Sequence, residues 1–177
     1  MNTLKPIIFL FPVIALVLVS LLYLFLANKT TDKQAFKWLI FRITTLAFVL
    51  NLTWELIQMP LYNPASFEIN HVLFCVLGSV ADAIMVLLIY FVFAALYKNP
   101  FWIKPPQWQR IVMLVATGGT GAILSEIRHL SLGNWGYSNL MPLIPYLNVG
   151  LSPVLQFMIL PSIIYFLSFW GFKKYLP

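Results

Sequence analysis

Five long apolar stretches, each about 20 residues or more, decide what this chain can fold into. They cover residues 7–27, 38–62, 71–97, 111–130 and 152–172. An α-helix rises about 1.5 Å per residue, so about 20 residues cross the ~30 Å hydrocarbon core of a bilayer. Backbone groups in lipid must be satisfied within their own segment, and these stretches are too long for barrel strands. We therefore predict an all-α, polytopic membrane bundle of five transmembrane helices, forming a single domain over residues 1–177.

The composition supports this prediction and excludes the soluble classes of protein. Of the 177 residues, 61% are hydrophobic and only 9% are charged, and the mean hydropathy is +0.88. These values exclude a soluble enzyme domain, a secreted disulfide scaffold and a disordered tail. The net charge of +6 does not indicate nucleic-acid binding, because the basic residues form short clusters at the ends of the spans.

The distribution of lysine and arginine predicts the orientation of the bundle. The basic residues concentrate in the first loop, in the third loop and in the C-terminal tail: Lys29, Lys33, Lys37, Arg42, Lys98, Lys104, Arg110, Lys173 and Lys174. With five spans, these three segments lie on the same side, which the positive-inside rule makes cytoplasmic. We therefore expect the N-terminus outside and the C-terminus in the cytoplasm.

The segment 132–150 has no charged residue and is rich in aromatic residues and proline. Aromatic rings such as those of Trp135 and Tyr137 are favoured at the level of the lipid headgroups. We interpret this segment as a lid or a re-entrant loop, and a sixth span is the alternative. A sixth span would place the lysines of the tail outside. The fifth helix is expected to begin near Ser152 as its capping residue.

The later half of the second span carries a polar stripe. Asn51, Glu55, Gln58 and Tyr62 follow one another at steps of four, three and four residues, which places them on one helical face. An ionisable side chain within a span costs about 2.5–3.5 kcal/mol on insertion scales, so its presence suggests a function. This face must therefore point into the bundle.

Further polar residues lie in the other spans, at positions that the predicted orientation places in the outer half. They are His71, Cys75 and Asp82 in the third span, Glu126, Arg128 and His129 in the fourth, and Gln156 in the fifth. We expect these residues to form one outward-facing polar cavity, closed towards the cytoplasm by apolar side chains. Arg128 is the expected ionic partner of Asp82.

The leading hypothesis is a membrane-embedded enzyme that acts by acid/base chemistry on a lipid or isoprenoid-like substrate. The predicted catalytic residues are Glu55, Asp82, Glu126 and His129. The spacing of Glu126 and His129 suits a pair that exchanges protons, while Glu55 and Asp82 would position or stabilise charge together with Arg128. The predicted substrate-binding residues are Asn51, Gln58, Tyr62, His71, Arg128, Trp135, Tyr137 and Gln156.

Two other classes of function stay open. One is a binding or transport component for a solute, a metal or haem. His71, Cys75 and His129 are its candidate ligands, but they form no recognised ligand motif, and no cofactor is predicted. The other is a structural subunit of a larger membrane complex, in which polar stripes join helices or subunits. The expected partners are membrane lipids, a small hydrophobic ligand, and a second copy or a partner in a complex; nucleic acid is not expected.

Several motifs resemble a family of small bacterial multi-span proteins of uncharacterised activity. These motifs are the segment 51–62, Ser125-Glu126, Trp135-Gly-Tyr137, Met141-Pro142, and the segment 150–153 followed by Gln156. The resemblance covers about the last three-quarters of the chain. It implies a bacterial inner-membrane protein and transfers no activity.

Overall fold

Helices make up nearly all the regular structure in the computed structural model, which describes residues 10–63, 68–103 and 107–170. The five long helices are α1 (Leu10–Lys29), α2 (Lys33–Gln58), α3 (Ile69–Leu96), α4 (Trp108–Ser131) and α5 (Leu151–Trp170). The shorter elements are η2 (Met59–Leu61), β1 (Tyr62–Asn63), β2 (Gly136–Tyr137), β3 (Leu143–Ile144) and β4 (Val149–Gly150). All five long helices are long and apolar enough to cross a membrane.

Each predicted span corresponds to one long helix, so the prediction of an all-helical bundle is confirmed. The largest shift is at the start of α2, which begins at Lys33 rather than at residue 38. Asp32 explains this start, because its side chain accepts a hydrogen bond of 2.8 Å from the backbone N–H of Ala35. The predicted ends at residues 7–9 and 171–172, together with Lys104, Lys173 and Lys174, lie outside the described residues.

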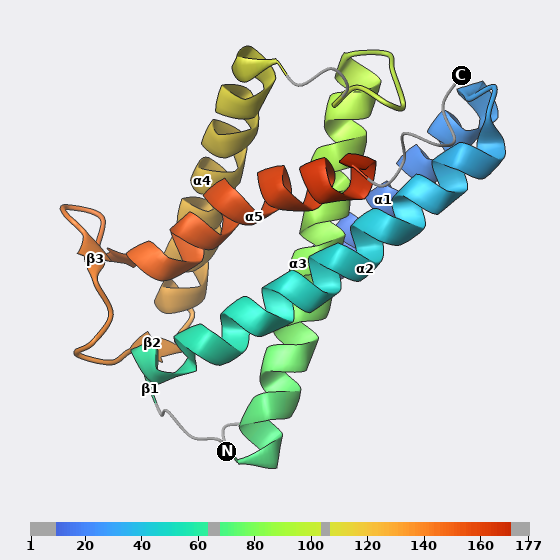
Figure 1. The fold of residues 1–177 in the computed structure, drawn as a ribbon. Coiled ribbons are helices and arrows are strands. Elements are labelled where there is room, and N and C mark those ends of the chain that lie inside the picture. Colours follow the sequence, from blue (N-terminus) through green and yellow to red (C-terminus); the bar gives the residue numbers. More distant parts are fainter. Residues whose placement is uncertain (1–9, 64–67, 104–106, 171–177) are drawn as a thin grey trace.

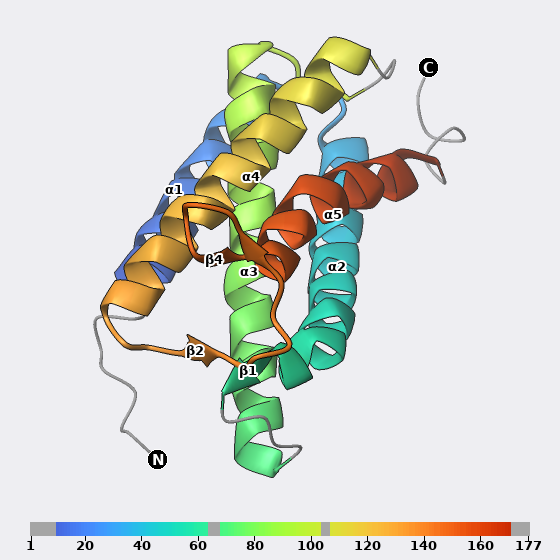
Figure 2. The same ribbon diagram turned by 90° about the vertical axis from the view of Figure 1, so that its left-hand side faces the viewer.

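The helices pack in pairs rather than around one central axis. α3 contacts α1 on one side and α2 on the other, while α5 lies across α2 and α4 (Figures 1 and 2). Contacts between α3 and α4 are few, so α4 is attached to the bundle mainly through α5.

Glycines allow the close approach of α4 to α5. A Cβ atom at Gly118 would lie only 2.0 Å from the carbonyl oxygen of Phe157, and one at Gly119 would lie 3.0 Å from Cγ of Met158. The glycine-rich segment 117–121 therefore serves helix packing, as small residues commonly do in membrane bundles.

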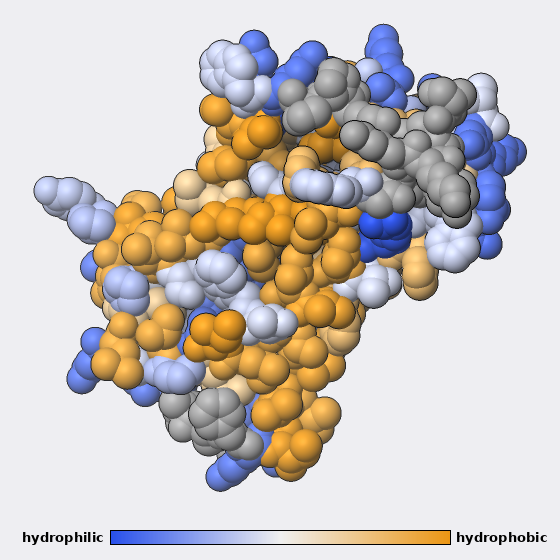
Figure 3. All heavy atoms as spheres, in the orientation of Figure 1, coloured by the Kyte–Doolittle hydropathy of each residue, from blue (hydrophilic) through white to orange (hydrophobic). Residues whose placement is uncertain are grey.

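The side of the bundle is apolar and its ends are polar, as a membrane-spanning bundle requires. In Figure 3 apolar residues cover most of the visible side of the helices, and hydrophilic residues gather at its upper right. The half of the core that lies towards the end of α3 and the start of α4 is aromatic. Tyr90, Trp102 and Tyr165 are fully buried there, and the indole N–H of Trp102 donates to the carbonyl oxygen of Tyr90 at 3.1 Å.

The segment 132–150 is not a sixth span. It contains the short strand β2 and a hairpin in which β3 pairs with β4, and it contains no helix. Its β2 pairs with β1 directly after the end of α2, with Tyr62 opposite Tyr137. The segment therefore folds back over the end of the bundle where α2 and α4 terminate and α5 begins.

Candidate functional site

Gln156 joins three helices in the interior of the bundle. Its side-chain Nε2 donates to Oδ1 of Asn51 at 2.8 Å and to Oδ2 of Asp82 at 3.0 Å. Only 1% of Gln156 and 1% of Asn51 is exposed. The polar stripes of α2, α3 and α5 therefore meet, as the helical spacing predicts.

Gln58 extends this network towards the end of α2. Its Nε2 donates to Oε1 of Glu55 at 2.9 Å and to Oε1 of Gln156 at 3.3 Å. Its own Oε1 accepts a hydrogen bond of 2.8 Å from the hydroxyl of Ser152. Ser152 lies inside α5, which begins one residue earlier, so the expectation that Ser152 caps this helix is wrong.

Glu126 of α4 receives its hydrogen bonds from the segment 132–150. The hydroxyl of Tyr137 donates to Oε2 of Glu126, and the indole N–H of Trp135 donates to the same oxygen at 3.3 Å. Glu126 is 6% exposed and carries a carboxyl group into the interior. The aromatic segment thus closes directly onto this carboxyl group.

His129 does not contact Glu126 directly in the way the spacing of three residues suggests. Its imidazole ring stacks on the indole of Trp135, with ring centroids 4.2 Å apart. Its Nδ1 lies 2.7 Å from the side-chain Nδ2 of Asn134. Trp135 therefore connects the two predicted proton-exchanging residues, by stacking on one and donating to the other.

Tyr62 and Tyr137 close the site on the side of the segment 132–150. Their rings lie 5.6 Å apart, and the side chain of Asn63 donates to the carbonyl oxygen of Tyr137 at 2.8 Å. Burial, followed by the nearby charge of Glu126, raises the pKa of Tyr62 above its ordinary value. Burial, followed by the hydrogen bond to Glu126, raises the pKa of Tyr137. Both hydroxyl groups therefore stay protonated and available as donors at neutral pH.

Three carboxyl groups come together from three helices. Glu55, Asp82 and Glu126 are near enough to one another to interact electrostatically. The neutral side chains described above supply their hydrogen bonds, and no lysine or arginine among the described residues forms an ion pair with them. We call this set, together with Asn51, Gln58 and Gln156, the polar cluster.

Arg128 does not neutralise Asp82, so this expectation is wrong. The guanidinium group of Arg128 lies over the ring of Phe11, 4.2 Å from its centroid. Arg128 follows Glu126 by two positions, and residues two apart on a helix do not share a face. The arginine therefore turns towards α1, while Glu126 turns inwards.

The amide side chains of the polar cluster are buried in this structure, whereas the sequence predicts that they line an open cavity. Gln58 is only 3% exposed, and the other amide side chains of the cluster are 1% exposed. Two grooves on the surface of the described residues lie elsewhere, one beside Arg110 and one between Tyr23, Ile40 and Phe91. Glu55 and Asp82 are partly exposed, whereas Glu126 is buried beneath Trp135 and Tyr137 of the segment 132–150.

The candidate metal ligands are not brought together. Cys75 is buried, and His71 is partly buried in the first turns of α3. Among the described residues, no three His, Cys, Asp or Glu side chains are grouped so that they could hold a metal ion. Haem or metal binding through His71, Cys75 and His129 gains no support from this arrangement.

Sequence reasoning missed one contributor to the site. Asn134 is the partner of His129. Asn134 lies in an uncharged segment outside the helices, so helical periodicity could not predict that it lies beside His129.

Comparison of the chain with protein-family models, with curated proteins and with solved structures gives no significant match. The resemblance to small bacterial multi-span proteins therefore rests on the sequence motifs alone.

Proposed function

We propose that this protein is a membrane-embedded enzyme that acts by acid/base chemistry on a lipid or isoprenoid-like substrate. One observation carries the proposal: three carboxyl groups from separate helices lie near one another, and among the described residues their hydrogen-bond partners are all neutral. Carboxyl groups and aromatic rings in a water-poor site stabilise positive charge that develops in a transition state. An isoprenoid or lipid double bond that accepts a proton develops such a charge.

The contacts suggest a role for each residue in this proposal. Glu126 gives or takes the proton, with the hydroxyl of Tyr137 as its immediate partner. Glu55 and Asp82 stabilise positive charge on the substrate. His129 acts as a positioning residue, because it stacks on Trp135 rather than contacting Glu126.

The enzymatic proposal is tested by removing the carboxyl groups one at a time. In Glu55→Gln and Glu126→Gln, the side chain keeps its size and loses its acid. We expect cells with either variant to show the lipid and pigment profile of a deletion strain, with product lowered at least about 100-fold, the usual contribution of a general acid or base. Glu68→Gln is the matched control, because Glu68 is exposed and lies before α3, away from the cluster. Profiles of both cluster variants equal to the wild type would contradict the proposal.

A second candidate function is the binding or transport of a cationic solute. It is favoured by the same three carboxyl groups, which no lysine or arginine among the described residues neutralises. A protein of this kind retains its cation through gentle purification, and native mass spectrometry would detect that cation. Loss of the bound species in Glu55→Gln, with an unchanged lipid profile of the cells, would favour this function over catalysis.

We also propose the bacterial inner membrane as the location, with the polar cluster near the outer surface and the C-terminus in the cytoplasm. The support is the concentration of lysine and arginine at the opposite end of the bundle.

Cysteine labelling tests this orientation. Because the single native cysteine, Cys75, is buried, an introduced cysteine reports its own side of the membrane. We expect a membrane-impermeant maleimide to label Asn139→Cys in intact cells, and to label Asn28→Cys only after permeabilisation. Both asparagines are exposed. The reverse pattern would invert the orientation.

A further inference from the structure

A groove at the start of α4 lies at the end of the bundle opposite the polar cluster. It has a volume of about 500 Å³, within the range of small-ligand sites, and Tyr97, Gln107, Trp108, Gln109 and Arg110 line it. No step of the proposed reaction involves this groove.

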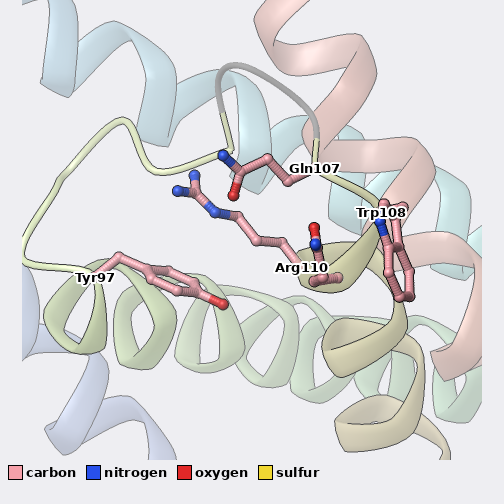
Figure 4. Close-up of a pocket in the computed structure, with 5 residues that line it drawn as sticks. Tyr97, Gln107, Trp108 and Arg110 are labelled. Carbon is pink, nitrogen blue, oxygen red and sulfur yellow. The ribbon is translucent and has the colours of Figure 1, made fainter.

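Arg110 supplies an uncompensated positive charge to this groove. Its guanidinium group lies over the ring of Tyr97, 4.6 Å from the centroid, and donates to the carbonyl oxygen of Trp102. Figure 4 shows this group between the Tyr97 ring and the side chain of Gln107. Its Nε is buried without a hydrogen-bond partner, and no carboxyl group among the described residues pairs with it. A partly buried guanidinium held in one orientation, without an anion, favours an anionic ligand.

The surroundings point to a ligand at the membrane surface. Trp108 is 69% exposed at the beginning of a transmembrane helix, which is where indole rings meet lipid headgroups. Lysines are also concentrated at this end of the bundle, and of the five acidic residues of the chain only Asp32 belongs to it. Gln107 makes no side-chain capping bond to the first turn of α4, where backbone N–H groups favour an anion.

From these observations we infer that the groove beside Arg110 binds the phosphate of an anionic phospholipid headgroup. Arginine matches phosphate because its planar group offers two parallel donors, and anionic lipids attract basic residues at the ends of spans. The tyrosine ring and the Trp102 carbonyl hold the guanidinium in place before the lipid binds, which lowers the entropy lost on binding.

Native mass spectrometry of the full chain in mild detergent tests this inference. The probes are phosphatidylglycerol and phosphatidylcholine with identical acyl chains, so that only the headgroup charge differs. We expect phosphatidylglycerol to bind at lower concentration than phosphatidylcholine. Arg110→Gln should weaken phosphatidylglycerol binding about tenfold, as the loss of one charge-assisted hydrogen bond predicts.

Two further variants keep the result interpretable if Arg110→Gln folds poorly. Gln109→Glu adds a repelling carboxylate to the groove, while a negative charge in the first turn of α4 favours the helix. It should weaken phosphatidylglycerol binding by a similar factor. Lys29→Gln removes one positive charge from the same end of the bundle. The ammonium group of Lys29 lies 4.1 Å from the centroid of the Phe25 ring, outside the groove. This variant should leave phosphatidylglycerol binding unchanged.

Three results would overturn the inference. Equal losses in Arg110→Gln and Lys29→Gln would reduce the effect to general attraction by the basic end. Equal binding of the two lipids would remove the requirement for an anionic headgroup. Displacement of phosphatidylglycerol by millimolar inorganic phosphate would assign the groove to a soluble anion instead.

Discussion

Gly118→Ala is expected to destabilise the bundle more than the same substitution at any other glycine of α4. Its Cβ would lie 2.0 Å from the carbonyl oxygen of Phe157 and 2.9 Å from the carbonyl carbon. Both atoms belong to the backbone of α5, so no side chain can move away and the two helices must separate. Overpacking of this kind costs about 3 kcal/mol or more. For a chain of this size, the Tm in mild detergent should fall by about 6–12 °C.

Pro161 explains why the contact is so close. Proline has no N–H, so the carbonyl of Phe157, four residues earlier in α5, lacks its usual helical donor. Gly118 presents backbone without a side chain to this carbonyl, and weak Cα–H···O contacts of this type recur between packed helices. Since α4 has few contacts with α3, its packing against α5 is its main helix–helix interface among the described residues.

Two neighbouring glycines provide graded controls for Gly118→Ala. A Cβ at Gly119 would meet Cγ and Sδ of Met158 at 3.0 and 3.3 Å, and this flexible side chain can shift, so Gly119→Ala should cost only about 1 kcal/mol. A Cβ at Gly121 would meet nothing within 4 Å, and Gly121→Ala should gain up to about 1 kcal/mol from helix propensity. Equal melting temperatures for all three variants would mean that α4 and α5 do not pack as closely as described.

The helices could be predicted from the sequence because hydropathy and backbone satisfaction in lipid leave few alternatives. The end of α2 shows where this reasoning stops. Polar residues such as Gln58 and Tyr62 follow the helical period, yet α2 ends at Gln58 and Tyr62 belongs to a strand. Periodicity identifies a shared face, but it does not reveal that η2 follows α2 and that Tyr62 pairs with Tyr137 of β2.

The convergence of Asn51, Asp82 and Gln156 could also be predicted, because buried polar groups in lipid must find one another. The partner of each group could not. By charge alone, Arg128 is the expected partner of Asp82. It lies two positions after Glu126 in α4, so the two side chains point in different directions, and the guanidinium group of Arg128 lies over the ring of Phe11. Pairings between helices depend on rotations about each helix axis, which a single sequence does not specify.

The burial of Glu126 beneath the segment 132–150 could not be predicted from the sequence either. Composition identified the segment 132–150 as aromatic and uncharged, and placed it at the headgroup level. The strand pairing of Tyr62 with Tyr137 and the insertion of Trp135 between Glu126 and His129 depend on tertiary contacts. These contacts cover Glu126, which the sequence predicts in an open cavity.

Replacement of Gln156 by leucine is expected to disconnect the polar cluster. Leucine has a similar volume but no polar atoms, so Asn51, Asp82 and Gln58 each lose one hydrogen-bond partner in the interior. Interhelical hydrogen bonds in membranes contribute about 0.6 kcal/mol each on average, whereas a buried polar group left unsatisfied costs about 1–3 kcal/mol. The cost of the unsatisfied groups should be the larger effect, because polar side chains of α2 and α3 all bond to this one amide of α5. We expect a loss of about 2–4 kcal/mol, and a Tm in mild detergent lower by about 4–16 °C.

Ser168→Ala is the matched control for Gln156→Leu, because it also removes a fully buried polar group from α5. Ser168 is 0% exposed, and its hydroxyl has no hydrogen-bond partner among the described residues. Its removal leaves no other group unsatisfied, so the Tm should stay unchanged or rise slightly. If Gln156→Leu melted at the same temperature as Ser168→Ala, the three helices would not depend on this amide. The enzymatic proposal would then lose the network that holds Asp82 in place. Gln156 positions this carboxyl group and has no assigned proton-transfer role. Gln156→Leu should therefore also lower product formation at temperatures where the variant is still folded.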